Sequence, residues 1–194
     1  MALTKPSGEW RYEDLERLPD DGKRYEIIEG ALYEMPAPGV DHAAIVMNLI
    51  GLLLPVITGM GGRLFTSPID VRFYGADPVQ PDLLAVLPGW SGTWRRRSVG
   101  GAPDLLIEVL SPSNRGHDLL TKRALYARAG VREYWIVNPA NQTVEILMLD
   151  RDAFHSAQVA KGDDPVNSPL LGGAAFALAE IFAWVDEIED ETSL

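Results

Sequence analysis

The sequence of 194 residues contains no cysteine, three histidines, and fewer basic than acidic side chains, 17 against 28. Without cysteine the chain forms no disulfide, holds no thiolate zinc site and has no cysteine nucleophile. The histidines lack the spacing of a zinc ligand set, so a histidine zinc site is not expected either. Carboxylates and lysines remain as the candidate reactive groups.

Uninterrupted apolar runs of membrane-spanning length are also missing. The longest candidate, at 45–57, is interrupted by Asn48, Gly51 and Pro55. The first residues lack the apolar core of a signal peptide. We therefore expect a cytoplasmic protein without a membrane partner.

The net charge of −11 argues against a protein that holds nucleic acid by charge alone, because an acidic surface repels phosphates. Part of this acidity lies in residues 186–194, for which we expect a disordered or frayed tail. The basic residues are clustered: Arg95, Arg96 and Arg97 are consecutive, and Arg115 follows later. Lys122, Arg123 and Arg128 come next, so we expect a local positive rim in the middle of the chain, with the four arginines as the residues that bind nucleic acid.

The hydrophobic fraction of 46% and the charged fraction of 23% are ordinary for a globular protein, and residues 1–185 are expected to form one domain. A strand at 105–110, a helix over 117–129 and a strand at 132–137 predict a β–α–β unit. Other helices are expected at 12–18, 42–54 (capped by Asp41) and 178–184, and other strands at 24–29, 31–35, 63–66, 70–74, 83–87 and 143–149.

Glu108 interrupts an otherwise apolar strand. A carboxylate there loses its hydration, and an unpaired buried charge is so costly that proteins pair it or give it a metal. Strand alternation places it on the same face as Leu106 and Leu110. Two explanations stay open: a metal site, or a buried salt bridge with Lys122 or Arg123.

Asp82 opens the apolar run at 83–87. If its strand lies beside that of Glu108, the two carboxylates can hold Mg²⁺, or Mn²⁺ instead, with the backbone carbonyl of Val109 as a third ligand. Such an ion neutralises phosphodiester oxygens and generates hydroxide. Lys122, on the following helix, can reach back to orient or deprotonate the attacking water. Taken alone, Asp82 has a structural alternative, because Asp at a strand start often caps a turn.

Four further side chains are accessory candidates. Asp118 precedes Lys122 by one helical turn, and either positions the lysine or forms a surface ion pair with it. His42 is either a site residue or a polar residue in the first turn of its helix. Glu26 and Glu29 lie on opposite faces of one predicted strand, so at most one of them faces the site.

A long surface loop is predicted at 88–103, where Trp90 and Trp94 stand beside the consecutive arginines. Aromatic rings next to guanidinium groups suit the stacking of bases. Anchoring of the loop against the core, or a dimer contact, explains the same pattern.

Several sequence blocks between residues 24 and 139 occur in the order typical of one family. They are Arg-Tyr-Glu-Ile-Ile-Glu-Gly at 24–30, Asp-His at 41–42, Gln-Pro-Asp-Leu at 80–83, Pro-Asp-Leu-Leu-Ile-Glu-Val-Leu-Ser-Pro-Ser at 103–113, Asp-Leu-Leu-Thr-Lys at 118–122, and Tyr-Ala-Arg-Ala-Gly-Val-Arg-Glu-Tyr-Trp-Ile-Val at 126–137. The chain resembles the Uma-two family of restriction endonucleases, formerly a domain of unknown function, within the PD-(D/E)XK nuclease superfamily.

The resemblance implies a restriction-endonuclease-like α/β fold, that is, a central mixed sheet flanked by helices, and the strands predicted at 24–29 and 31–35 are expected to add an N-terminal β-hairpin extension. It implies that Asp82 and Glu108 are metal ligands. Leu110 stands two positions after Glu108, where the superfamily has its lysine, so Lys122 takes that role.

We expect a magnesium-dependent endonuclease that cleaves DNA as a homodimer, so that two sites address two strands. The alternatives are a non-catalytic module of the same fold that binds protein or nucleic acid, and a metal-dependent hydrolase that acts on RNA.

Overall fold

The computed structural model of the chain describes most of the sequence. The described residues are 2–3, 9–11, 14, 17–18, 24–28, 30–35, 39–76, 78–96, 98–111 and 117–188. The helix predicted at 12–18 falls largely outside them.

The centre of the fold is a mixed sheet of six strands in the order β12-β11-β10-β9-β6-β4. β9 and β10 are parallel and are connected by a helix, α3, whereas the other neighbouring strands run antiparallel. The strands are β4 (Arg63–Thr66), β6 (Leu83–Val86), β9 (Leu105–Val109), β10 (Glu133–Asn138), β11 (Thr143–Asp150) and β12 (Ala153–Ala160), and α3 is His117–Ala129. The mixed α/β sheet and the β–α–β unit predicted from the sequence are confirmed.

Helix α2 (Val40–Gly59) is longer than the helix predicted at 42–54. It begins after Gly39, so Asp41 lies in its first turn and is not the N-cap. It also continues beyond Pro55, because the proline is on the exposed side of the helix, where the lost backbone hydrogen bond faces water.

One stripe of α2 is buried: Ile45, Leu49, Leu53 and Ile57 follow one another at intervals of four residues. Helix α2 has 20 residues, and an 18-residue stretch of it has a mean hydropathy of 1.9, so by length and composition alone it is apolar enough to cross a membrane. The sequence analysis expected no stretch of that kind, because polar residues, glycine and proline interrupt the run. The buried stripe of α2 packs against the central sheet in one continuous apolar cluster.

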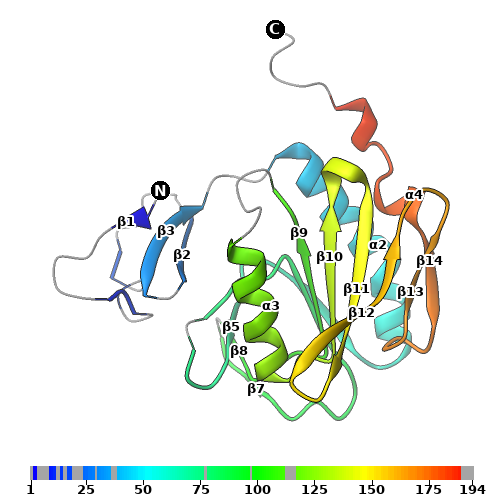
Figure 1. Cartoon of the computed structure of the whole chain (residues 1–194). Helices are drawn as coiled ribbons and strands as arrows, with labels where there is room; N and C mark the ends of the chain where they lie inside the picture. The colour runs from blue at the N-terminus through cyan, green and yellow to red at the C-terminus, as the bar shows by residue number, and fades with distance from the viewer. Residues whose placement is uncertain are drawn as a thin grey trace, which may run out of the picture.

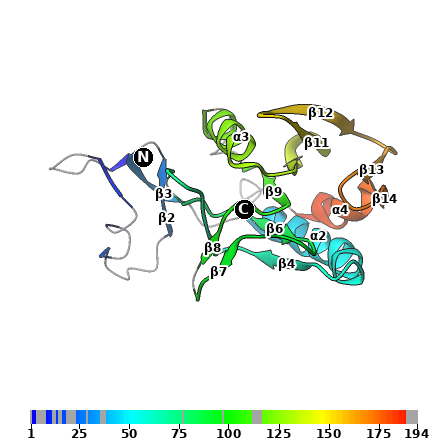
Figure 2. The same cartoon turned by 90° about the horizontal axis from the view of Figure 1, so that it is seen from below.

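The two long helices cover opposite faces of the sheet (Figures 1 and 2). The alternation along β9 shows why both faces are apolar. Leu105, Ile107 and Val109 belong to the cluster that contains α2, whereas Leu106 packs with Tyr126 of α3. The apolar run of β9 is therefore buried on both faces, apart from the carboxylate of Glu108.

A second sheet lies at the N-terminus, to one side of the central sheet (Figure 1). It consists of β1 (Ala2–Leu3), β2 (Arg24–Ile28) and β3 (Ala31–Met35), in the order β1-β3-β2. Gly30 closes the β2–β3 hairpin with a φ of 75°, in the left-handed region that glycine adopts freely. The N-terminal hairpin extension is confirmed.

The segment 88–103, predicted as a long loop, contains two short strands instead. These strands, β7 (Thr93–Trp94) and β8 (Ser98–Gly100), join β5 (Asp70–Arg72) in a three-stranded sheet. Strands of two or three residues leave no alternating pattern, so the Gly, Ser and Arg content dominated the prediction.

The end of the described chain contains a hairpin, a helical turn and a 3-10 turn. They are β13 (Pro165–Ser168), β14 (Ala174–Ala177), α4 (Leu178–Ile181) and η2 (Val185–Glu187), and another 3-10 turn, η1 (Pro139–Asn141), connects β10 to β11. The helix predicted at 178–184 is thus shorter.

The predicted acidic tail, 186–194, begins inside η2. There Asp186 accepts a hydrogen bond of 2.6 Å from Gln142. This part of the tail is therefore attached to the fold, and residues 189–194 lie outside the described residues.

Glu133 is fully buried at the start of β10, with 0% of its surface exposed. Its carboxyl group accepts hydrogen bonds from Trp135 Nε1 at 2.6 Å, Ser168 Oγ at 2.6 Å and the backbone nitrogen of Leu170 at 2.9 Å. Three donors compensate for the hydration that the carboxyl group loses. The group connects the central sheet to the β13–β14 hairpin.

We expect Glu133→Ala to lower the free energy of unfolding by about 3 kcal/mol or more, because each buried donor left unsatisfied costs about 1–3 kcal/mol. Urea denaturation followed by circular dichroism measures this loss. Glu180→Ala, on the exposed side of α4, is the matched control and should change stability by less than about 0.5 kcal/mol. A loss at Glu133 no larger than that of the control would contradict this role.

Candidate active site at the ends of β6 and β9

Asp82 and Glu108 lie on adjacent strands. Leu83 of β6 is opposite Ile107 of β9 in the antiparallel register. Continuing that register by one residue places Asp82, which directly precedes β6, opposite Glu108. Opposed residues of an antiparallel pair are close neighbours. The strand adjacency expected from the sequence is therefore present.

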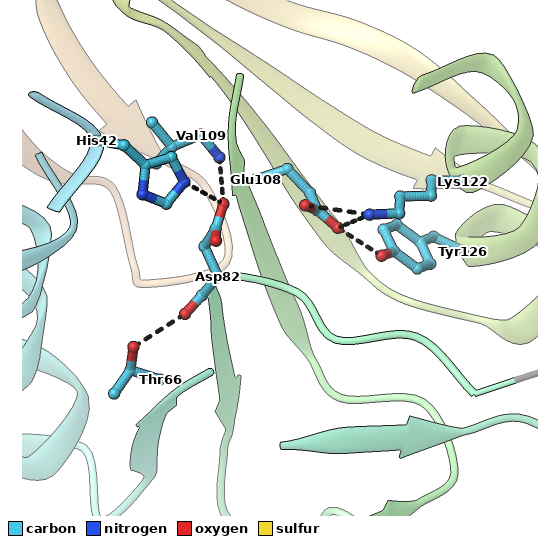
Figure 3. A network of polar contacts seen from close by, with 7 residues as sticks. All are labelled: His42, Thr66, Asp82, Glu108, Val109, Lys122 and Tyr126. Atoms are coloured by element: carbon cyan, nitrogen blue, oxygen red, sulfur yellow. Dashed lines mark hydrogen bonds and ion pairs between the residues drawn. The ribbon is translucent and has the colours of Figure 1, made fainter. Parts of the chain in front are cut away.

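The carboxylate of Asp82 is buried and accepts hydrogen bonds through one of its two oxygens. Oδ2 lies 2.8 Å from the backbone nitrogen of Val109 and 3.2 Å from Nε2 of His42 (Figure 3). The backbone carbonyl of Asp82 accepts hydrogen bonds from Thr66 Oγ1 at 3.2 Å and from the backbone nitrogen of Ser67 at 3.0 Å. Asp82 thus ends the β6–β9 ladder, a structural role that does not exclude a chemical one.

The carboxylate of Glu108 faces α3. Its Oε1 accepts a hydrogen bond of 2.7 Å from the hydroxyl of Tyr126 and lies 3.3 Å from Nζ of Lys122. Lys122 is only 6% exposed, so this ion pair is largely shielded from water. The reach of Lys122 back to Glu108, which the sequence predicted, is present. Arg123 donates instead to the carbonyl of Phe154 at 3.2 Å.

The two carboxylates have different partners. Figure 3 shows Asp82 turned toward His42 and Val109, and Glu108 turned toward Lys122 and Tyr126. Within the part of the chain that the structure describes, no group of three or more His, Cys, Asp or Glu side chains is placed to hold a metal ion. A shared ion would therefore depend on these two acids together with backbone and water oxygens.

His42, in the first turn of α2, is part of this site. Burial by itself lowers the pKa of His42, but the hydrogen bond to Asp82 and the negative charges of Asp82, Asp41 and Glu108 outweigh it, and the net pKa is raised. The sequence left His42 open between a site residue and a polar residue in the first turn of its helix. Its contact with Asp82 places it next to one of the candidate ligands, and its role in the site stays a prediction.

The other predicted site residues are not brought to this point by the described structure. Arg95 and Arg96 are exposed beside β7. Glu26 lies in β2 and Asp118 in α3, but their side chains fall outside the description. Glu29, Arg97 and Arg115 lie outside the described residues altogether.

Tyr126 is a site residue that the sequence analysis did not find. It lies one helical turn after Lys122, so both side chains project from the same face of α3 toward Glu108. That spacing was the available signal. The contact of Thr66 with Asp82 left no signal in the sequence, because it depends on the pairing of β4 with β6.

A central mixed sheet between two helices, with acids on adjacent strands and a lysine on the crossover helix, defines a restriction-endonuclease-like fold. The chain belongs to the Uma2 family, whose model, described as "Putative restriction endonuclease", matches residues 12–179. This confirms the family resemblance seen in the sequence.

The fold is also similar to that of a crystal structure described as "a putative nuclease belonging to DUF820 from Anabaena variabilis". The TM-score is 0.71 at 23% sequence identity, and the match covers 91% of this chain and 99% of the other. No curated protein matches the chain.

His42 should make a pH-dependent contribution to the stability of the metal-free protein. Its folded-state pKa is raised, so the stabilisation by the charged His42–Asp82 pair is full below the unfolded-state pKa and is lost as pH rises through the folded-state pKa. We therefore expect His42→Gln to lose more stability at about pH 5.5 than at about pH 8.5.

Urea denaturation with a chelator present measures this difference. His155→Gln, on an exposed position of β12, is the control and should lose equally little at both pH values. The assignment fails if the loss at His42 is the same at both pH values or grows with pH.

Proposed function

We propose that this protein is a metal-dependent endonuclease that hydrolyses phosphodiester bonds in DNA. The observation that carries the proposal is the location of three candidate groups at one end of the β6–β9 pair, where the two carboxylates turn to different partners. Asp82 and Glu108 are opposed across the two strands, and Nζ of Lys122 lies 3.3 Å from Glu108. Membership of the Uma2 family supports nuclease chemistry of this kind.

The donors at the site fit a hard divalent cation, Mg²⁺ or Mn²⁺, which prefers carboxylate, carbonyl and water oxygens. Oδ1 of Asp82 makes no polar contact within the described part of the chain, so this oxygen is available to a cation. When bound, such an ion would neutralise phosphate oxygens and lower the pKa of a water molecule.

Val109 offers a third oxygen. The backbone N–H of Val109 points to Asp82, at 2.8 Å from Oδ2. Because the N–H and C=O of one residue in an extended strand point to the same side, the carbonyl of Val109 is expected on the Asp82 side of β9. We therefore assign Asp82, Glu108 and the carbonyl of Val109 as the ligands.

Lys122 and Tyr126 provide the remaining functional groups. The ammonium of Lys122 is held against Glu108 by a buried ion pair, and the Tyr126 hydroxyl orients the same carboxylate. An ammonium in this position can orient the attacking water and offset charge that develops on the phosphate. His42 positions Asp82 from α2, on the face of the sheet opposite to α3.

Asp82→Asn, Glu108→Gln and Lys122→Met should each lower the rate of plasmid cleavage by about 100-fold or more, because each removes a ligand or the group that orients water. Nicking and linearisation of supercoiled plasmid with Mg²⁺ or Mn²⁺ measures the rate, and circular dichroism verifies the fold. Lys161→Met, exposed after β12, is the control and should cleave at the parent rate.

A non-catalytic module of the same fold is the second candidate. It is favoured by the Glu108–Lys122 pair, which already balances the buried charge without a cation, and by the net charge of −11. Calorimetry with magnesium separates the two: binding that Asp82→Ala abolishes supports the enzyme, and no binding supports the module. Metal binding with plasmid, single-stranded DNA and RNA all left intact would end the nuclease proposal.

We further propose that the enzyme acts as a homodimer, so that two sites face the two strands of a duplex. An exposed apolar stripe on α2 supports this: Val40, Met47 and Leu54, seven residues apart, are 60%, 64% and 42% exposed. Sedimentation should show dimers that Met47→Glu dissociates, with Glu180→Ala as the control. A monomeric parent protein at all concentrations would contradict this arrangement.

A further inference from the structure

A cavity of about 420 Å³ is lined by residues of β4, β5, β7 and β8 and by Gln80, which stands two residues before Asp82. Its walls include Phe65, Gln80, Trp94, Arg95 and Arg96, and we refer to it as the tryptophan cavity. The volume is within the range of small-ligand sites, at the lower end that a nucleobase and its sugar would need. The cavity therefore has the size for one nucleoside unit.

The aromatic wall of the cavity is held in place from behind. The Trp94 ring lies 5.3 Å from that of Phe65 and 4.8 Å from that of Trp90, with tilted planes. Trp90 is in turn anchored by a hydrogen bond of 2.7 Å from its Nε1 to the carbonyl of Ala102. Trp94 nevertheless remains 48% exposed. It is thus a fixed ring with an accessible surface, as base stacking requires.

The polar wall of the cavity suits the rest of a nucleotide. Arg95 and Arg96 are exposed at the cavity, where guanidinium groups can bind phosphate. Gln80 donates a hydrogen bond of 2.8 Å to Asp70, and its amide oxygen contacts no polar group within the described residues. Amide groups of this kind form hydrogen bonds with base edges.

The tryptophan cavity is also connected to the site by the chain itself. Gln80 lies two residues before Asp82. On the other wall, Pro68 follows Ser67, whose backbone N–H donates to the carbonyl of Asp82 at 3.0 Å. A phosphodiester bound at Asp82 would therefore place a neighbouring base of the same strand near Trp94.

Arg95 continues this path beyond the cavity. It also borders a larger cavity of about 1120 Å³, whose lining includes Arg11, Arg72 and Tyr74. Arginines interspersed with aromatic side chains are typical of grooves that follow a single nucleic acid strand.

We propose that the tryptophan cavity binds an unpaired nucleobase of the strand to be cleaved, with Trp94 as the stacking surface and Arg95 and Arg96 on the adjoining phosphate. In a duplex both faces of a base are covered by its neighbours, so only a single-stranded or extruded base can enter. This inference rests on the proposed function, because it specifies the substrate of the same site as a strand in which one base is unpaired or extruded from the duplex.

Binding without cleavage tests the proposal. Chelator removes divalent ions, and fluorescence anisotropy then measures the Kd of the whole protein for labelled oligo(dT) and for a duplex of equal length. We expect tighter binding of the single strand. Trp94→Leu, which keeps apolar contact with Phe65 but removes the aromatic face, should weaken single-strand binding about tenfold or more.

Two further variants control this experiment. Trp94→Phe should restore most of the binding, because a smaller aromatic face is still present. Trp184→Ala, at a tryptophan that is 55% exposed and does not line the cavity, should bind as the parent does. Labelled oligo(U) compares RNA with DNA as the source of the unpaired base.

Failure of this inference can be told apart from failure of the nuclease proposal. If single-strand binding is tight and depends on Trp94, but no cleavage follows when magnesium is added, the cavity assignment holds and the nuclease proposal fails. If the protein cleaves but Trp94→Leu leaves its affinity for oligo(dT) unchanged, the nuclease proposal holds and the cavity assignment fails. Equal affinity of the parent for duplex and single strand, or no affinity for either, also overturns the cavity assignment.

Discussion

The antiparallel pairing of β6 with β9 is the constraint on which the candidate site depends. Leu83 and Ile107 are opposed in this pair, and both are buried in the cluster beneath α2. Slipping the register by one residue would move these side chains out of the cluster beneath α2 to the face that packs on α3, and would move Asp82 to the other face, so the packing of the core fixes the register. The hydrogen bond from Val109 to Asp82 then completes the ladder. The position of the acids is thus a consequence of how the core packs.

Stability alone does not account for the charges gathered at this point. Both charges of a buried ion pair lose their hydration, and apolar side chains of similar volume often stabilise a core as much or more. The Glu108–Lys122 pair nevertheless lies near the end of β9, whose other residues are all apolar, with a second acid and a histidine close by. This combination supports the proposed chemistry at the strand ends.

Local patterns in the sequence predict part of the fold and of the site. The boundaries of α3 and the approach of Lys122 to Glu108 follow from an apolar strand, a helix closed by Gly130 and one lysine of sufficient length. The role of His42 does not follow, because its partner Asp82 is brought near by the packing of α2 on the sheet. β7 and β8 do not follow either, since strands so short are defined by their neighbours and not by their own composition.

The acidic character of the chain bears on how nucleic acid could be held. A body with a net charge of −11 repels phosphates overall, so electrostatic affinity for duplex DNA at physiological salt should be small. Stacking on an aromatic ring does not depend on net charge, and it stabilises only bases that are not already stacked between neighbouring bases. In the proposed binding mode, an acidic body with an exposed Trp94 held by Trp90 would gain selectivity for unpaired bases from the same charge that weakens binding to intact duplex.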